Sequence, residues 1–233
     1  MTRLFAPLLG ITLVAATSAA LGADFDVGRA TLRMSDDGWV SVGTVTDELP
    51  FSGDWHVSGT IQIAKRSVLL VDSTNRFRAA VVASATRGVP TIHLRWSDDC
   101  LSQDNMYAIN ARQGNIEGRD CLRVTGLVGI QRYLTARAPT VAAELTERKT
   151  VVPAAGYVVV DEVALVNGAF VSVQAVIAAD VEFPVGVGGP ESLPAGIRAE
   201  VVAWAQRLAE GARASIHSLS GLLVVPAVTT TAK

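Results

Sequence analysis

The sequence predicts a mainly β protein, an antiparallel sandwich or twisted sheet (α+β) with a C-terminal amphipathic helix packed on one face. Segments rich in Val, Ile and Thr, separated by Gly, Pro, Asp and Asn, follow one another from residue 30 to 177, as strands joined by turns do. Near the C-terminus, Val201, Trp204, Leu208 and Ala212 recur at helical spacing. An apolar helical stripe of this kind needs a partner surface, so we expect it to cover the sheet.

Strands are expected first at 38–45 and 55–60, where alternate residues would form one face turned to the core and one turned outward. Segments 67–71 and 78–83 flank the turn formers at 72–75, which favours a hairpin. Segment 91–96 alternates and predicts a half-buried strand. Segments 157–166 and 170–177 are almost wholly apolar, and the Asn-Gly pair between them predicts a hairpin of central strands.

The only two cysteines, Cys100 and Cys121, are expected to form a disulfide if the chain is exported. The bridge would close about 20 residues and stabilise the fold by roughly 3 kcal/mol. Segment 97–119 lacks an apolar period and is rich in Asp and Asn, so it predicts a long surface loop. Loops of that length are often functional.

The remaining segments complete the expected domain organisation. Segment 122–133 predicts one or two strands, and 139–148 a short helix with Thr140 near its cap. The sequence is divided into a signal peptide at 1–22, a β-rich domain at 23–182 with the disulfide-closed loop 100–121, a Pro/Gly linker at 183–196, and a helix and tail at 197–228. The tail includes an expected last strand within 219–228.

The N-terminus predicts export. Arg3, an apolar run at 4–16 and small residues at 17–23 have the layout of a secretory signal, which favours a periplasmic or secreted protein. The alternative is a retained membrane anchor, which is less favoured because the run is shorter than the roughly 20 residues of a bilayer span. If the signal is cleaved, no membrane span is expected in the mature chain. The net charge of −2 becomes −3 without Arg3, which gives no reason to expect nucleic acid.

Candidate catalytic groups are few. His56, His93 and His217 form no HExxH or HxH pair, and an exposed surface histidine is the favoured interpretation of the first two. His217 is expected to act as a cation at the end of the helix. His93 with Asp98 and Asp99 is the best available acid–base set. No GxSxG or SxxK motif is present.

Metal and cofactor sites are not expected. Asp98, Asp99, Asp104 and Asp120 lie at or near the closed loop, but the EF-hand pattern is absent and a solvated loop explains them. The glycines at 186–189 lack the Lys and helix start of a phosphate loop. Trp39, Trp55 and Trp96 are expected in the core rather than on a sugar-stacking surface, and Trp204 in the helix stripe.

We therefore expect an exported cell-envelope protein, a non-catalytic binding or structural module whose partner is an envelope protein or a glycan. One alternative is an exported hydrolase that uses His93 and carboxylates of the 98–120 loop. Another is an assembly protein that uses the C-terminal helix.

Overall fold

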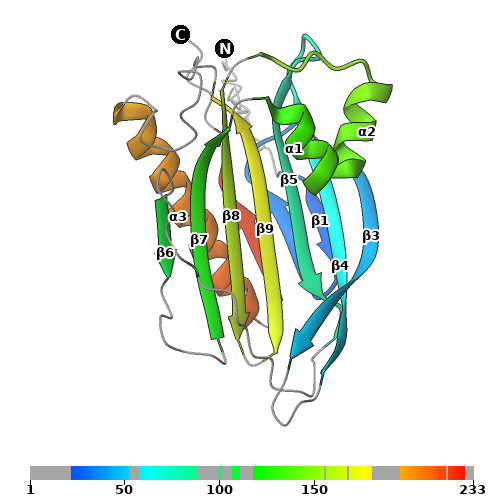
Figure 1. The fold of residues 1–233 in the computed structure, drawn as a ribbon, viewed down its shortest axis with the longest axis vertical. Helices are drawn as coiled ribbons and strands as arrows, with labels where there is room; N and C mark the ends of the chain where they lie inside the picture. Colours follow the sequence, from blue (N-terminus) through cyan, green and yellow to red (C-terminus); the bar gives the residue numbers. More distant parts are fainter. Residues whose placement is uncertain are drawn as a thin grey trace, which may run out of the picture.

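The computed structural model describes residues 22–52, 58–88, 100, 107–110, 118–127, 129–154, 156–166, 168–179, 195–218 and 220–228. They contain a seven-stranded antiparallel sheet (Figure 1), with strand order β3, β4, β5, β9, β8, β7, β6. Its strands are β3 Trp39–Ser52, β4 Ser58–Val71, β5 Phe77–Thr86, β6 Tyr107–Asn110, β7 Gly118–Leu127, β8 Tyr157–Val166 and β9 Ala169–Ala178. A smaller mixed sheet contains β1 Asp24–Val27, β2 Ala30–Met34 and β10 Leu222–Val225. The prediction of a mainly β fold is confirmed.

Both predicted hairpins are present. The β4–β5 turn is closed by Asp72, whose carboxylate accepts the backbone N–H groups of Thr74 at 2.9 Å and Arg76 at 3.1 Å. Asn75 there adopts a left-handed φ of 57°, which Asn tolerates better than most residues. The β8–β9 connection is two residues long, and Gly168 has a φ of 81°. β9 and β8 lie between β5 and β7, so they are central strands as predicted.

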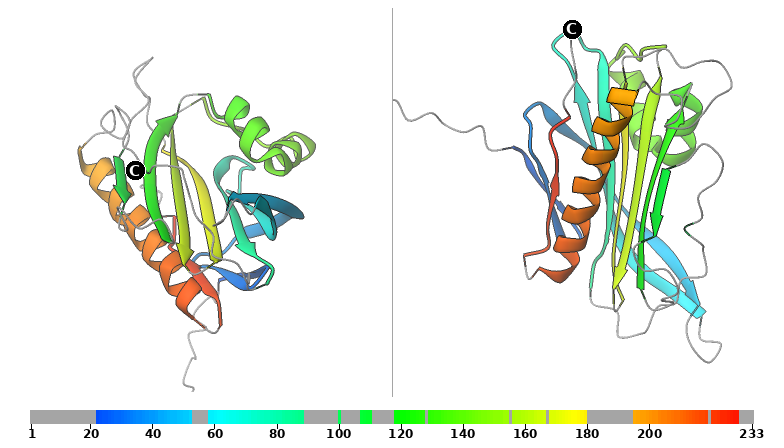
Figure 2. Two further views of the ribbon diagram at one scale, coloured as in Figure 1. Left: turned by 60° about the horizontal axis from the view of Figure 1, so that its bottom comes forward. Right: turned by 90° about the vertical axis from the view of Figure 1, so that its left-hand side faces the viewer.

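Helix α3 (Ala195–His217) and the smaller sheet cover one face of the large sheet, which we call the inner face (Figure 2). Trp204, Leu208 and Ala212 are buried there among Val160 and Val173 of the central strands. The predicted apolar stripe therefore packs on the sheet. The described helices include none that is both long and apolar enough to cross a membrane.

Helices α1 (Ile130–Arg137) and α2 (Pro139–Glu147) lie on the opposite, outer face, near one end of the sheet (Figure 2). Ile130 and Leu134 of α1 and Val141 and Leu145 of α2 are buried against outer-face residues such as Val159. Thr140 does not cap α2: Ala138 is the N-cap, and the Thr140 hydroxyl donates to Ser67 of β4 at 2.9 Å. The bond ties α2 to the sheet.

Three sequence predictions need correction. Segment 97–119 is not wholly a loop, because β6 lies within it and β7 begins at Gly118. Segment 122–133 contains the end of β7 but then the start of α1 instead of a second strand. Helix α3 begins at Ala195, two residues inside the expected linker. The predicted strand at 91–96, residues 53–57 and residues 180–194 lie outside the described residues, as do residues 1–21.

Candidate functional site

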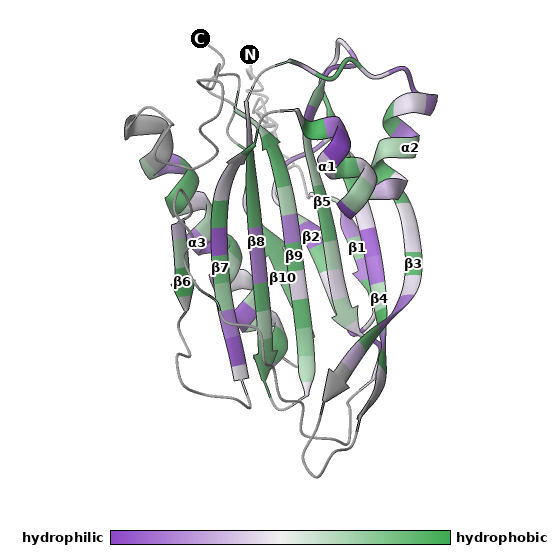
Figure 3. Ribbon diagram, in the orientation of Figure 1, coloured by the Kyte–Doolittle hydropathy of each residue, from purple (hydrophilic) through white to green (hydrophobic). Residues whose placement is uncertain are grey.

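Strands β7 and β8 carry charged residues on both of their faces. Figure 3 shows hydrophilic bands that interrupt the otherwise hydrophobic central strands. Because neighbouring side chains of a strand point to opposite faces, Asp161 lies on the outer face and Glu162 on the inner face of β8. The same alternation separates Arg119 from Asp120 on β7. The two sheet faces thus have separate polar groups.

On the outer face, the strand register places three polar side chains in one row. Arg123 of β7 is opposite Asp161 of β8, and Asp161 is opposite Gln174 of β9. The amide Nε2 of Gln174 donates to Oδ1 of Asp161 at 2.8 Å. Burial raises the pKa of the Asp161 carboxyl, while the Gln174 hydrogen bond and the charges of Arg123 and Arg137 lower it in part.

Helix α1 brings two further groups to this row. Ile130 and Leu134, one turn apart, are buried and hold the helix on the sheet. Tyr133 and Arg137, also one turn apart, line the space beside the row. Burial and then the nearby negative charge of Asp161 raise the pKa of the Tyr133 phenol, and Arg137 opposes them only in part. Tyr133 therefore keeps its hydroxyl proton and is a hydrogen-bond donor at any physiological pH.

These groups surround a pocket of about 240 Å³. Among the described residues, three guanidinium groups and one carboxyl line it, and these residues carry a net positive charge even when Asp161 is ionised. Arginine presents a planar fork of N–H donors that matches a carboxylate. The pocket is lined by Arg119, Cys121, Arg123, Tyr133, Arg137, Asp161, Val163 and Gln174. We call it the arginine pocket.

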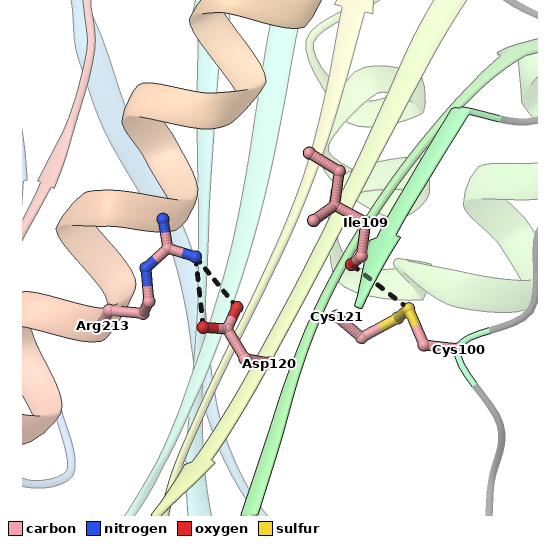
Figure 4. The surroundings of a disulfide bond; sticks show 5 residues. All are labelled: Cys100, Ile109, Asp120, Cys121 and Arg213. Atoms are coloured by element: carbon pink, nitrogen blue, oxygen red, sulfur yellow. Dashed lines mark hydrogen bonds and ion pairs between the residues drawn. A yellow bond between two sulfur atoms is a disulfide. The ribbon is translucent and has the colours of Figure 1, made fainter. Parts of the chain in front are cut away.

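The predicted disulfide between Cys100 and Cys121 is present, and it lies beside the arginine pocket, which Cys121 lines. Figure 4 shows Cys121 and its neighbour Asp120 pointing away from one another across β7. Sγ of Cys100 lies 3.5 Å from the carbonyl oxygen of Ile109 on β6. An oxidised cysteine has no S–H, so this is a van der Waals contact rather than a hydrogen bond. The bridge fixes residue 100 against β7 and β6.

On the inner face, two carboxyl groups are buried under α3. Both carboxylate oxygens of Asp120 accept from Nη1 of Arg213 on α3, at 3.0 and 3.1 Å (Figure 4). Glu162 is fully buried, and its carboxyl lies beside that of Asp120, which can accept a hydrogen bond from it when Glu162 is protonated. Burial, and then the charge of Asp120, raise the pKa of Glu162 to about 8, although Arg213 and Arg119 act in the opposite direction. Glu162 is therefore mostly protonated at neutral pH.

The sequence-predicted catalytic candidates fall largely outside this description. His93, Asp98 and Asp99 lie outside the described residues, as do His56 and Asp104. His217 is exposed in the last turn of α3. Asp120, expected in a solvated loop, is instead a buried residue of β7. In the described ranges, no group of three or more His, Cys, Asp or Glu residues could hold a metal ion.

The residues of the arginine pocket were not singled out from the sequence. Arg119 lies in a segment that the sequence predicts to be a loop, Arg123 lies in a predicted strand, and Asp161 lies in a segment that is almost wholly apolar. One signal was available. Asp161 and Glu162 interrupt the apolar sequence of a central strand, and buried carboxyls need nearby partners.

Comparisons with known proteins were made by family, by sequence and by structure. No family model matches the chain, and neither a curated protein nor a solved structure was found to be significantly similar to it.

Proposed function

We propose that the protein is a non-catalytic binding module of the cell envelope, and that the arginine pocket binds a sugar carrying a carboxylate, such as a uronic acid. The observation that carries the proposal is the convergence of Arg119, Arg123 and Arg137 on one pocket. Two of these residues come from a strand of the rigid sheet and one from a helix packed on it. Preorganised arginine forks favour an anionic ligand over a neutral one.

The other groups of the pocket fit a sugar ring. Asp161 and Gln174 are side chains that hydrogen-bond hydroxyl groups, and the Tyr133 phenol adds a donor beside an apolar ring. The volume of about 240 Å³ is below the roughly 300–1,000 Å³ of sites for drug-sized ligands. A single sugar unit is therefore a better match than a large cofactor.

A hydrolase receives less support from the described residues. Glycoside hydrolysis uses two carboxyl groups that face one substrate, whereas Asp161 is the one acidic residue among the described residues that line the arginine pocket. Asp120 and Glu162 share the inner face, but both are buried and both lie near Arg213 of α3. Assembly through α3 is also less favoured, because its apolar stripe is covered by the sheet.

The proposal includes the compartment: the protein works in the periplasm or outside the cell. The Cys100–Cys121 disulfide supports an oxidising compartment. Fractionation of cells that make the protein, with thiol alkylation before lysis, would test this point. A full-length, reduced protein in the cytoplasmic fraction would contradict it.

The binding proposal is tested with a matched ligand pair, glucuronate and glucose, which differ by the carboxylate. Isothermal titration at low salt should show binding of glucuronate at least about tenfold tighter than binding of glucose, because a charge-assisted hydrogen bond contributes roughly 1.5–3 kcal/mol. Arg137→Gln should remove most of this preference. Arg132→Gln is the control, since Arg132 is exposed on the same helix and does not line the pocket. Equal binding of both sugars, or no binding of glucuronate, would refute the proposal.

A further inference from the structure

Strand β3 is an edge strand with a long exposed segment. Within the described part of the large sheet it pairs with β4 alone, and it lies at one side of that sheet (Figure 1). Residues 44–48 are all exposed, and Thr44, Val45 and Thr46 are β-branched residues of the kind that favours strands. An exposed edge of this kind presents backbone N–H and C=O groups to which a strand of another chain can add.

The hydrogen bonds of β4 show which backbone groups of β3 face outward. The N–H of Arg87 donates to the carbonyl of Gln62 at 3.1 Å, so the backbone groups of Gln62 point toward β5. Those of the next residue, Ile63, point the other way, toward Asp47 on β3. The backbone groups of Asp47 therefore point inward to β4. By the same alternation, the outward backbone groups are those of residues 44, 46, 48 and 50.

Two of these four outward positions cannot donate to an added strand. The N–H of Glu48 is already used, because Oδ1 of Asp47 accepts it at 2.9 Å. Residue 50 is a proline, which has no N–H. Proline is tolerated within a sheet where the missing donor would face away from the neighbouring strand, as it does here. The donors of the edge are therefore lost at two successive outward positions.

Lys65 of β4 holds the Asp47 carboxylate in place. Its ammonium group donates to Oδ2 of Asp47 at 2.8 Å, while Oδ1 accepts the N–H of Glu48. The hydrogen bond from Lys65, and then that from Glu48, lower the pKa of the Asp47 carboxyl, so it stays ionised at neutral pH. The exposed edge thus carries a negative charge in a fixed position, and charged side chains on an edge oppose the addition of a strand.

The outward groups define an antiparallel pairing with a second copy of β3, centred on Asp47. A β-bulge between Ser41 and Gly43 breaks the regular register on the other side of the exposed segment. In the pairing centred on Asp47, residue 44 lies opposite residue 50 of the second copy and residue 46 lies opposite residue 48, so outward groups meet. The chain lacks the donors of residues 48 and 50. The two Asp47 carboxylates would also lie directly opposite one another, which is destabilising.

We propose that Asp47 and Pro50 prevent this edge from pairing with a second copy of the chain. Asp47 acts through its charge and through its bond to the Glu48 N–H, and Pro50 acts through its missing donor. The donors of Thr44 and Thr46 alone add too little to offset the loss of translational and rotational freedom on association. The inference does not depend on the sugar site, because neither Asp47 nor Pro50 lines the arginine pocket.

The test is sedimentation velocity of the wild type and of the double variant Asp47→Ala/Pro50→Val, over about a hundredfold range of protein concentration. The double variant should dimerise with a dissociation constant at least about tenfold lower than that of the wild type, because two donors per copy are restored and the facing charges are removed. Amide hydrogen exchange should then show new protection within residues 44–50. No gain in association would overturn the proposal, as would association without this protection. A wild type that already forms dimers protected at residues 44–50 would overturn it as well.

Further variants separate the charge of Asp47 from its bond to the backbone. Asp47→Asn removes the charge but keeps an oxygen that can accept the Glu48 N–H, so Asp47→Asn/Pro50→Val should associate more weakly than Asp47→Ala/Pro50→Val. Equal association of the two would overturn the role of that bond. Glu210→Ala, which removes the same charge from an exposed position of α3, should not cause association.

The fold of each variant is checked by circular dichroism and urea unfolding. Pro50→Val alone restores one donor per copy, keeps the contacts of Asp47, and should give a smaller gain in association than the double variant. It is the milder change at an exposed position and serves as the test if the double variant does not fold. In that case, association of Pro50→Val equal to that of the wild type would overturn the proposal.

Discussion

Replacing Glu162 with glutamine should make the protein more stable at neutral pH than the wild type. In the folded protein, the pKa of Glu162 is raised from its ordinary 4.5 to about 8, first by burial and then by the charge of Asp120. In the unfolded chain the carboxyl is solvated and ionises near its ordinary pKa. Arg213 already pairs with Asp120, so a second negative charge there would compete with Asp120 for the same guanidinium group. Glutamine has a similar size and carries no charge at any pH.

The sign and size follow from proton linkage. Between pH 4.5 and 8 the folded state holds a proton on Glu162 that the unfolded state has lost, so the wild type becomes less stable as pH rises through this window. One pKa unit corresponds to about 1.4 kcal/mol. The free energy of unfolding of the wild type, relative to that of Glu162→Gln, should therefore fall on the order of 2–3 kcal/mol from pH 5 to pH 7.

The assay is urea unfolding followed by circular dichroism at pH 5, 6, 7 and 8, with the disulfide intact. Comparing the two proteins at each pH cancels the other titrating groups, such as Asp24 and Asp47, whose lowered pKa values make stability fall in acid instead. Glu210→Gln is the matched control, because Glu210 is exposed on α3 and its removal should leave the pH dependence unchanged. A difference between wild type and Glu162→Gln that stays constant from pH 5 to pH 7 would refute the reasoning.

Three further substitutions test the backbone conformation, the packing and the disulfide. Lys149→Gly should raise the free energy of unfolding by about 0.5–1 kcal/mol, because glycine adopts the left-handed φ of 52° without a Cβ penalty; a lower midpoint in urea would contradict this. Gly211→Ala should destabilise by about 1–3 kcal/mol although alanine favours helix, since its Cβ would lie 2.8 Å from the carbonyl oxygen of Val224; a higher melting temperature would argue against that contact. Replacing both Cys100 and Cys121 with serine should reduce stability by about 3 kcal/mol through lost loop closure across 21 residues, and equal urea midpoints would exclude this contribution.

The parts of the fold that follow from local patterns were predictable. The β4–β5 and β8–β9 hairpins carry their turn signals in the residues between the strands, and α3 carries a 3.6-residue apolar period. The smaller sheet was harder, because β10 pairs in parallel with β2 across nearly the whole chain. α1 was missed because its eight residues hold only two buried apolar positions, Ile130 and Leu134.

The site was less predictable than the fold, for a physical reason that β7 illustrates. Residues 119–123 mix charged and apolar side chains without a regular period. Such a segment resembles a solvated loop when the residues packed around it are unknown. In the structure Asp120 points to Arg213, 93 positions further along the chain. Arg123 points the other way, to Asp161 and Gln174. A pattern based on burial treats every charge as solvent-facing, and it fails where partners come from other elements.

The adjacent residues Asp161 and Glu162 show the same effect within one strand, because their carboxyl groups lie in two different environments. Asp161 lies among arginines and Gln174 beside a pocket, whereas Glu162 is buried under α3 beside Asp120. A strand with period two cannot aim neighbouring side chains at one site. Two acidic residues in succession within a central strand must therefore have two separate roles, one on each face of the sheet. Here the outer carboxyl belongs to the proposed sugar site, and the inner one is predicted to make the stability of the folded protein fall as pH rises.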